Sequence, residues 1–118
     1  AFFSPAEDAV AFPNDDAFEC EHERESTKAH EGIHATGARH RLNRKAFREY
    51  SVENYAYEEL VAELGAAMTC SHLGIPLEKL QHTQYIRSWM KSLKDDKKFL
   101  FRAAAEASKG FQLLTGVE

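Results

Sequence analysis

The spacing of apolar and polar residues predicts a mainly helical chain that begins with a short β-hairpin. Two strand-like runs, AFFS and AVAFP, flank the turn sequence PAED, so we expect a β-hairpin over residues 1–12. Four predicted helices follow, and all but the third have capping residues or a glycine at their ends. These segments are residues 15–36, 51–73, 77–93 and 97–114. The predicted fold class is therefore α+β, mainly helical, with the small N-terminal hairpin packed on the first helix.

Capping signals and an apolar stripe define the second predicted helix, which follows an irregular segment. Residues 37–51 have no periodicity and are rich in Arg, Lys and Asn, which is typical of a connecting loop. Ser51 provides an N-cap and Gly74 a stop for this helix, and Gly37 likewise ends the first helix. The side expected to face the core carries five apolar residues at one-face spacing: Leu60, Val61, Leu64, Ala67 and Met68.

The composition is that of one small folded domain. Hydrophobic residues make up 43% of the 118 residues, enough for a modest core, and the formal net charge is −4. This charge gives no overall attraction to nucleic acids or anionic membranes. Residues 15–28 carry six acids against two bases, and residues 87–102 carry six bases against two acids. We therefore expect an acidic and a basic side, each of the kind that solvated helix faces present.

The sequence predicts a soluble, cytoplasmic protein without a membrane partner. No apolar run approaches the roughly 18 residues that a membrane-spanning helix needs, and no signal peptide is recognisable. Cys20 and Cys70 are too few and too far apart for a disulfide scaffold, so we expect free thiols. The chain starts with Ala1 instead of an initiator methionine, and we expect that it is a piece of a longer protein.

Residues 30–34 form the pattern His-Glu-x-x-His, which is typical of zinc metallopeptidases. On a helix, His30 and His34 lie on one face one turn apart, so both imidazoles can bind a single metal ion. Glu31 follows His30 directly, so its side chain leaves the helix next to the face that carries the two histidines. Its carboxylate is therefore expected beside the ion. There it can accept a proton from the attacking water and pass it to a leaving amine.

Two candidates for the third metal ligand remain open at the level of the sequence. The second predicted helix carries Glu59 and Glu63 four residues apart, so Glu59 can ligate the metal while Glu63 accepts a hydrogen bond from the far nitrogen of a ligand histidine. This is the layout of gluzincins. His40 is the rival, because it extends the pattern to the metzincin signature. Metzincins also need a Met-turn, whereas Met68 and Met90 lie in predicted helices, so Glu59 is the preferred ligand.

Two further groups are predicted to lie near the metal. Tyr55 shares a helix face with Glu59 and could donate a hydrogen bond to negative charge that develops on the substrate, although core packing is the commoner role of such a tyrosine. The strand AVAFP, around Val10, could pair with an extended substrate along its edge. The remaining histidines are predicted to be surface residues: His22, His72 and His82.

Four segments of the chain, taken in order, resemble one protein family. They are AFFSPAEDAVAFP, HEGIHATGARHRLNR, YAYEELVAELGAAMTCSHLGI and YIRSWMKSLKDDKKFLFRAAAEASK. Together they resemble the C-terminal zincin-like metallopeptidase domain of the ArdC antirestriction proteins of conjugative plasmids and phages. The resemblance implies a zincin-like fold, with His30, His34 and Glu59 as metal ligands and Glu31 as general base. It also implies that a single-stranded-DNA-binding domain precedes this region, so DNA would be a partner only through that missing N-terminal domain.

Three functions are consistent with these features. The first is a zinc-dependent peptidase that acts on a protein or peptide substrate. The second is a metal-stabilised, non-catalytic interaction module that blocks a restriction or host-defence protein. The third is a DNA-handling piece that uses the basic residues 87–102, against which the negative net charge counts. For the single metal ion, two imidazoles and one carboxylate suit Zn²⁺ best and are also compatible with Mn²⁺ or another divalent ion.

Overall fold

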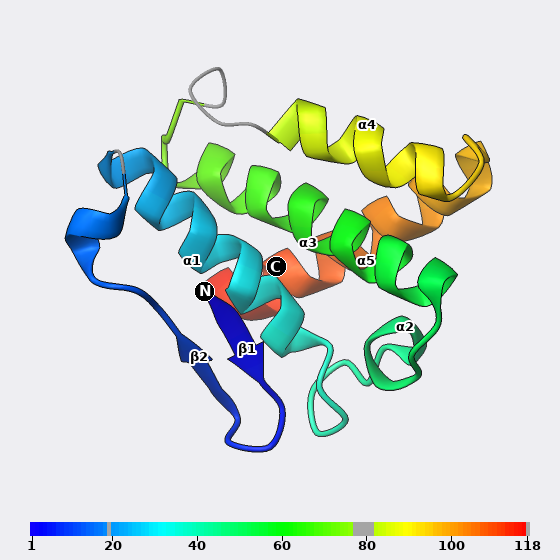
Figure 1. Ribbon diagram of the computed structural model, residues 1–118, viewed down its shortest axis with the longest axis horizontal. Helices are drawn as coiled ribbons and strands as arrows, with labels where there is room; N and C mark the ends of the chain where they lie inside the picture. Colours follow the sequence, from blue (N-terminus) through cyan, green and yellow to red (C-terminus); the bar gives the residue numbers. More distant parts are fainter. Residues whose placement is uncertain (19, 77–81, 118) are drawn as a thin grey trace.

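The computed structural model describes residues 1–18, 20–76 and 82–117, in which a small hairpin precedes a set of packed helices (Figure 1). The strands are β1 (Phe2–Ser4) and β2 (Ala9–Ala11), followed by a single 3-10 turn, η1 (Asp15–Ala17). The helices are α1 (Glu21–Thr36), α2 (Lys45–Arg48), α3 (Val52–His72), α4 (His82–Ser92) and α5 (Lys97–Thr115). The mainly helical α+β class predicted from the sequence is confirmed.

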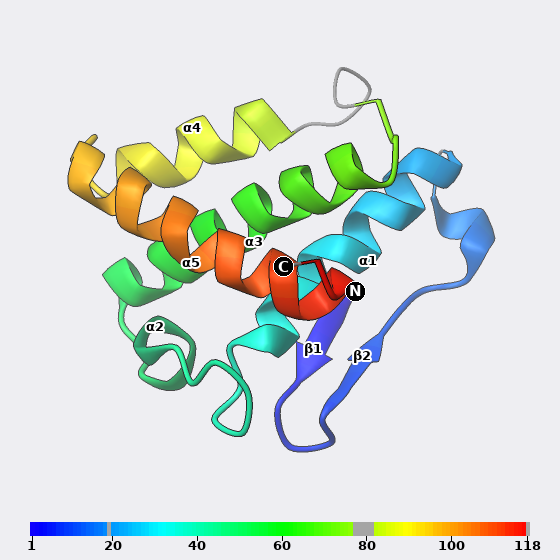
Figure 2. The same cartoon turned by 180° about the vertical axis from the view of Figure 1, so that it is seen from behind.

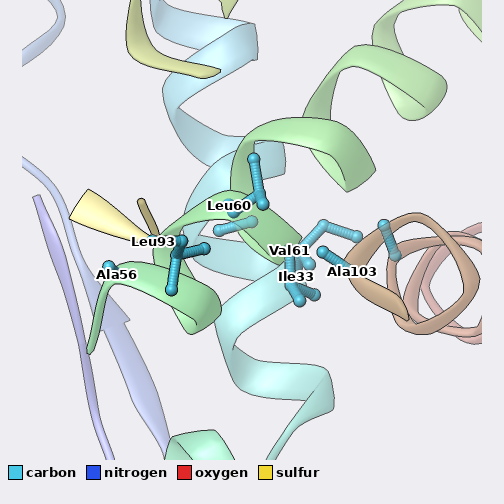
Figure 3. Close-up of a cluster of buried hydrophobic side chains, with 8 residues drawn as sticks. Ile33, Ala56, Leu60, Val61, Leu93 and Ala103 are labelled. Carbon is cyan, nitrogen blue, oxygen red and sulfur yellow. The ribbon is translucent and has the colours of Figure 1, made fainter. Parts of the chain in front are cut away.

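Helix α3 is the centre of the molecule, and α1, α4 and α5 all pack against it. In Figure 1, α3 lies between α1 and α4, and α5 crosses behind it; Figure 2 shows this crossing from the other side. Buried side chains of these helices form the main core, including Ile33 of α1, Leu60 and Val61 of α3, and Ala103 of α5 (Figure 3). Of the apolar stripe predicted for α3, Leu60 and Val61 are buried in this core and Leu64 and Met68 pack against it. Ala67, the fifth predicted residue, is only partly buried and is not part of the core.

A glycine allows α1 and α3 to approach closely where the two helices meet. A Cβ atom at Gly65 of α3 would lie 2.7 Å from Ile33 Cγ1, closer than side-chain carbons pack. Ile33 has no exposed surface, so it could not move aside without disturbing the core. Because His30 and His34 flank Ile33 on α1, this close approach also brings both histidines toward α3.

The first predicted helix starts later than expected. Asp15–Ala17 forms the separate turn η1, and α1 begins at Glu21. The chain breaks here because Phe18 adopts an extended backbone (φ −99°, ψ 144°), which a helix cannot contain. Cys20 is also extended and is the N-cap residue of α1, and acidic side chains in the following turn favour this start.

Two other boundaries differ from the prediction, and the rest agree. The predicted loop at residues 37–51 contains α2, whose four residues are too few to produce a periodic pattern. The third predicted helix, residues 77–93, corresponds to α4, although residues 77–81 lie outside the described part of the chain. The N-cap of α3 is as predicted, because Ser51 Oγ accepts a hydrogen bond from the Asn54 backbone N at 2.9 Å.

None of the helices in the described ranges is long and apolar enough to cross a membrane.

The hairpin is tied to the helical part at its turn. Strands β1 and β2 are antiparallel, with Phe3 opposite Val10. Asp8 in the turn accepts hydrogen bonds from Arg41 at 2.8 and 2.9 Å and lies 3.2 Å from His40 Nε2. Both strands also contact α1, so the predicted packing of the hairpin on this helix is confirmed.

Candidate metal site

Helices α1 and α3 bring three of the predicted site residues to one point. His30 and His34 are one turn apart on α1, and their Nε2 atoms lie 3.1 Å from each other. Glu59 of α3 approaches both: its Oε2 is 3.1 Å from His30 Nε2, and its Oε1 is 3.0 Å from His34 Nε2. Two imidazole nitrogens and one carboxylate therefore converge, and all three side chains are partly buried.

The far nitrogen of each histidine is bound by another carboxylate of α3. His30 Nδ1 donates to Glu63 Oε1 at 2.7 Å, and His34 Nδ1 donates to Glu58 Oε2 at 2.8 Å. Ionised carboxylates only accept hydrogen bonds, so both Nδ1 atoms carry a proton. In the neutral rings, the Nε2 atoms then present their lone pairs to the point of convergence, as metal-ligating histidines do.

The carboxylates make this site attract positive charge. Burial disfavours protonated His30, but hydrogen bonds to Glu59 and Glu63 outweigh it and raise the pKa of His30 to about 9. Burial acts the same way on His34, and bonds to Glu58 and Glu59 raise its pKa to about 10. Burial would also favour neutral Glu59, yet the two histidines lower the pKa of Glu59 to about 2. The carboxylates around His30 and His34 carry more negative charge than their surroundings neutralise. Either protons on the two imidazoles or a metal cation bound between them would neutralise this charge.

A buried arginine from the segment between α1 and α3 fixes Glu58. Arg44 Nε donates to Glu58 Oε1 at 2.7 Å, and Arg44 Nη2 donates to Glu58 Oε2 at 2.9 Å. The guanidinium also donates to Thr36 Oγ1 and to the carbonyl oxygen of Ile33, both at 2.8 Å. Both members of the Arg44–Glu58 pair are buried. Arg44 therefore joins the last turn of α1 to the carboxylate that holds His34.

Gly37, which the sequence marked as the end of α1, has a packing role in this network. Its φ of −79° is open to any residue, so the position does not need glycine for its backbone conformation. A Cβ atom there would lie 2.6 Å from Arg44 Nη2. The missing side chain therefore makes room for the guanidinium.

Sequence reasoning missed both Glu58 and Arg44. A third carboxylate in the segment EELVAE was the signal available for Glu58, which directly precedes Glu59. No local signal distinguishes Arg44 from the other basic residues of the predicted loop, because its role depends on how α1 and α3 meet.

Glu31 and Tyr55 lie at a cavity of about 430 Å³ that also reaches His34 and Glu59. The Tyr55 ring meets Trp89 edge to face, with centroids 5.4 Å apart, so this tyrosine packs on one side and faces the cavity on the other. The negative charge of Glu59 raises the pKa of Tyr55, which keeps the phenol available as a hydrogen-bond donor. The predicted catalytic glutamate is thus placed beside the converging ligands.

His40 lies apart from this group. Its side chain is 60% exposed, it contacts Asp8 of the hairpin turn, and it lines a different cavity. Met68 and Met90 belong to helices and pack against the core, so neither forms a Met-turn. Of the other histidines, His72 is exposed and His22 is partly buried, while the side chain of His82 lies outside the described part of the structure.

The hairpin is oriented differently from the expectation for AVAFP. Val10 of β2 lines the same cavity as His40, whereas Phe2 and Phe3 of β1 line the cavity at Glu31. Figure 1 shows β2 on the outer side of β1, farther from α2. Strand β1, not β2, therefore lies beside the candidate site.

The donor set fits a divalent cation. The candidate ligand atoms of His30, His34 and Glu59 all lie within 4.8 Å of one another. Two imidazole nitrogens and a carboxylate oxygen are a ligand set that zinc and related divalent ions accept. The hydrogen-bonded Nδ1 atoms supply the outer contacts that such ligands normally have.

Comparison with known proteins points to the same class of domain. The profile of a family described as zincin-like metallopeptidase matches residues 1–106. The chain is 38% identical over 109 residues to the DNA primase TraC of Escherichia coli. It is 34% identical over 110 residues to the protein y4eC of Sinorhizobium fredii. Each alignment covers 92% of this chain.

Crystal structures of the antirestriction protein ArdC from plasmid R388 have a similar fold. The Mn(II)-bound structure matches with a TM-score of 0.78 at 39% identity, over 98% of this chain and 43% of ArdC. The metal-free structure matches with a TM-score of 0.75 at 40% identity, over 97% of this chain and 41% of ArdC. The resemblance to ArdC expected from the sequence motifs is confirmed.

The chain spans only part of each of these proteins, namely 8% of TraC, 36% of y4eC and 43% of ArdC. The likeness therefore concerns this region and not their whole activities. Within this region, the family profile covers nearly the entire sequence. The chain belongs to the zincin-like metallopeptidase family.

Proposed function

We propose that this chain is a zinc-dependent metallopeptidase domain of the ArdC type, with His30, His34 and Glu59 as metal ligands and Glu31 as general base. The proposal is carried by the convergence of the two Nε2 atoms and the Glu59 carboxylate, each 3.0 to 3.1 Å from the next, beside a cavity that Glu31 also lines. Structural zinc sites are closed by four protein ligands, whereas catalytic sites have three and an open position. Three ligands beside a cavity support the catalytic type.

Each polar side chain around the ligands has a role in this proposal. When bound, the zinc ion supplies Lewis acidity that polarises a peptide carbonyl and makes water more acidic. Glu31 accepts the proton of the attacking water and delivers it to the leaving amine nitrogen. Glu63 and Glu58 hold the imidazoles of His30 and His34 through their Nδ1 protons.

Tyr55 is the proposed donor to negative charge on the substrate oxygen. Its place at the cavity and its raised pKa support this role, because the phenol keeps its proton beside Glu59. His40 has no part in the proposed chemistry, since it faces another cavity.

The proposed substrate is a protein or peptide in extended conformation. In the described residues, β1 pairs with β2 along one edge only. The other edge of β1 is the proposed place where the backbone of an extended chain would pair. Because Phe2 and Phe3 of β1 line the cavity, a peptide paired there would pass beside Glu31.

A second candidate function is a metal-stabilised module that binds and blocks a restriction or host-defence protein without cleaving it. The match to a protein described as an antirestriction protein favours this alternative. Blocking would need the fold that the metal supports, but it would not need a general base.

The Glu31→Gln variant separates these two functions. It keeps the size of the side chain and removes the base, so we expect bound zinc to stay at one ion per chain while cleavage of denatured casein falls by about 100-fold or more. Glu7→Gln, at an exposed glutamate of the hairpin turn, is the matched control and should cleave like the wild type. Full metal content without cleavage by the wild type would favour the blocking module, and manganese in place of zinc would correct the metal assignment.

A further inference from the structure

We propose that the cavity beside the candidate metal site binds a large apolar side chain of the substrate, with aromatic residues preferred. The inference rests on the proposed function, because it assigns a specificity to the same site. It is carried by a cluster of aromatic side chains that the fold assembles next to the ligands.

Two partly buried phenylalanines from distant parts of the sequence form one wall of the cavity. Phe3 of β1 and Phe47 of α2 have ring centroids 5.8 Å apart, with planes inclined by 44°. Helix α2 is held in this position because Arg44, the residue before it, is bound to buried Glu58. The wall is therefore anchored to the same network that orients His34.

Three more aromatic side chains at this cavity are exposed to solvent: Phe2 (59%), Tyr50 (86%) and Tyr55 (49%). Single exposed aromatic residues are common, but several gathered around one cavity form an apolar patch of the kind that marks binding sites. A side chain placed among them would cover surface that is otherwise left in water.

The charges at the cavity disfavour acidic ligands. Three carboxylates line it, those of Glu31, Glu58 and Glu59, against one guanidinium, that of Arg48. An acidic side chain of a substrate would therefore meet an excess of negative charge. The volume of about 430 Å³ lies in the range of pockets that hold small molecules, so a phenyl or indole ring has room. A glycine or alanine would leave the Phe3–Phe47 wall uncovered.

Amino-acid hydroxamates test the inference without requiring turnover. The hydroxamate group binds a zinc ion, and the adjoining side chain then samples the cavity. Calorimetry would give the Kd of glycine, phenylalanine and aspartate hydroxamates for the zinc-loaded chain, with the metal-free chain as the blank. We expect the phenylalanine compound to bind about tenfold or more tightly than the glycine compound, because it buries a ring. The aspartate compound should bind most weakly.

Three variants test whether the aromatic side chains of the cavity cause the preference for the phenylalanine compound. Phe47→Ala should reduce the ratio of the two affinities to less than about threefold, because the ring loses its wall. Phe2→Ala, at an exposed position, should also reduce this ratio, and it does not disturb the ion pair that holds α2. If thermal melting shows that Phe47→Ala is misfolded, the result for Phe2→Ala alone tests whether the aromatic cavity produces the preference. Phe101→Ala, at an exposed ring of α5 away from the cavity, should keep the full preference.

Equal affinities of the glycine and phenylalanine compounds would overturn the inference. The same conclusion would follow from a preference that survives in both folded cavity variants. Failure of every hydroxamate to bind the zinc-loaded chain would instead contradict the proposed function, and the inference with it, because the ion would have no open position.

Discussion

Glu59 and His40 differ in what their side chains contact, and this difference predicts opposite effects of removing them. Glu59 is partly buried and reaches both Nε2 atoms at 3.0 and 3.1 Å. His40 is exposed and contacts the hairpin turn. The role of each side chain thus depends on the partner it meets across the fold, although both are competent zinc ligands by residue type.

Glu59→Ala should remove most of the bound metal. Loss of one of three ligands is expected to weaken metal affinity by at least about 100-fold, more than the loss of an outer hydrogen bond does. Thermal stability should fall as well, because metal binding is coupled to folding. His40→Ala should keep the metal at one ion per chain, as measured by elemental analysis after dialysis. Retained metal in the Glu59 variant together with lost metal in the His40 variant would establish the metzincin alternative.

Arg44 connects three secondary-structure elements. It precedes α2, donates to the last turn of α1, and forms an ion pair with Glu58 of α3. Buried ion pairs of this kind cost desolvation energy, so their main effect is seen when one partner is removed. The segment predicted as a loop is in this way the part that fixes how His34 is held.

Arg44→Met should destabilise the protein by about 3–5 kcal/mol, because buried Glu58 loses its charged partner and keeps only its hydrogen bond to His34. Adding Glu58→Gln should recover part of this loss, and both quantities follow from urea unfolding monitored by circular dichroism. Arg41→Met is the matched control: its pair with Asp8 lies near the surface, where water screens both charges, so its loss should cost far less than the loss of Arg44. Equal costs for the two arginines would mean that the buried network contributes little.

Elements with local signals could be predicted from the sequence, and those set by tertiary contacts could not. Helix geometry alone places His30, Glu31 and His34 within one turn of each other, and it does the same for Glu59 and Glu63. The sequence was therefore enough to predict which of these residues lie together in the structure. The pairing of Arg44 with Glu58 depends on the meeting of two helices far apart in sequence. For the same reason, no pattern indicated that β1, rather than β2, would lie at the cavity.

Charge is distributed unevenly over the whole molecule. The predicted acidic segment lies at the start of α1, where Arg24 neutralises part of it through contacts with Asp15, Glu21 and Glu25. The predicted basic segment covers the end of α4 and the start of α5, with its lysines exposed to solvent. Figure 1 shows these two regions on opposite sides of the domain. The candidate site is a third charged region, negative and partly buried between α1 and α3.

This buried negative charge predicts that protons and metal compete for the same site and that each stabilises the folded molecule when bound. In the metal-free chain, the carboxylates raise the pKa of His30 to about 9 and that of His34 to about 10, above the ordinary value of 6.5. A raised pKa means that the folded state binds protons more tightly than the unfolded state. The resulting stability is fully present below pH 6.5 and is lost as the pH rises through 9 to 10. The lowered pKa of Glu59, about 2, places its titration far below this window.

In the zinc-loaded chain, the same two imidazoles are neutral ligands, so protons compete with the metal and binding strengthens as the pH rises. The difference in melting temperature between zinc-loaded and EDTA-treated protein should therefore widen steadily from pH 6 to pH 8.5, measured by differential scanning calorimetry at a fixed slight excess of zinc. With zinc at about 100 times its Kd, the added stability would be about 2.7 kcal/mol, which corresponds to a rise of several degrees. The Glu59→Ala variant should show little difference between the two conditions at any pH, because it lacks a ligand. A difference that stays constant or narrows with rising pH would show that His30 and His34 do not exchange protons for the metal, and the assignment of the site would fail at its central pair.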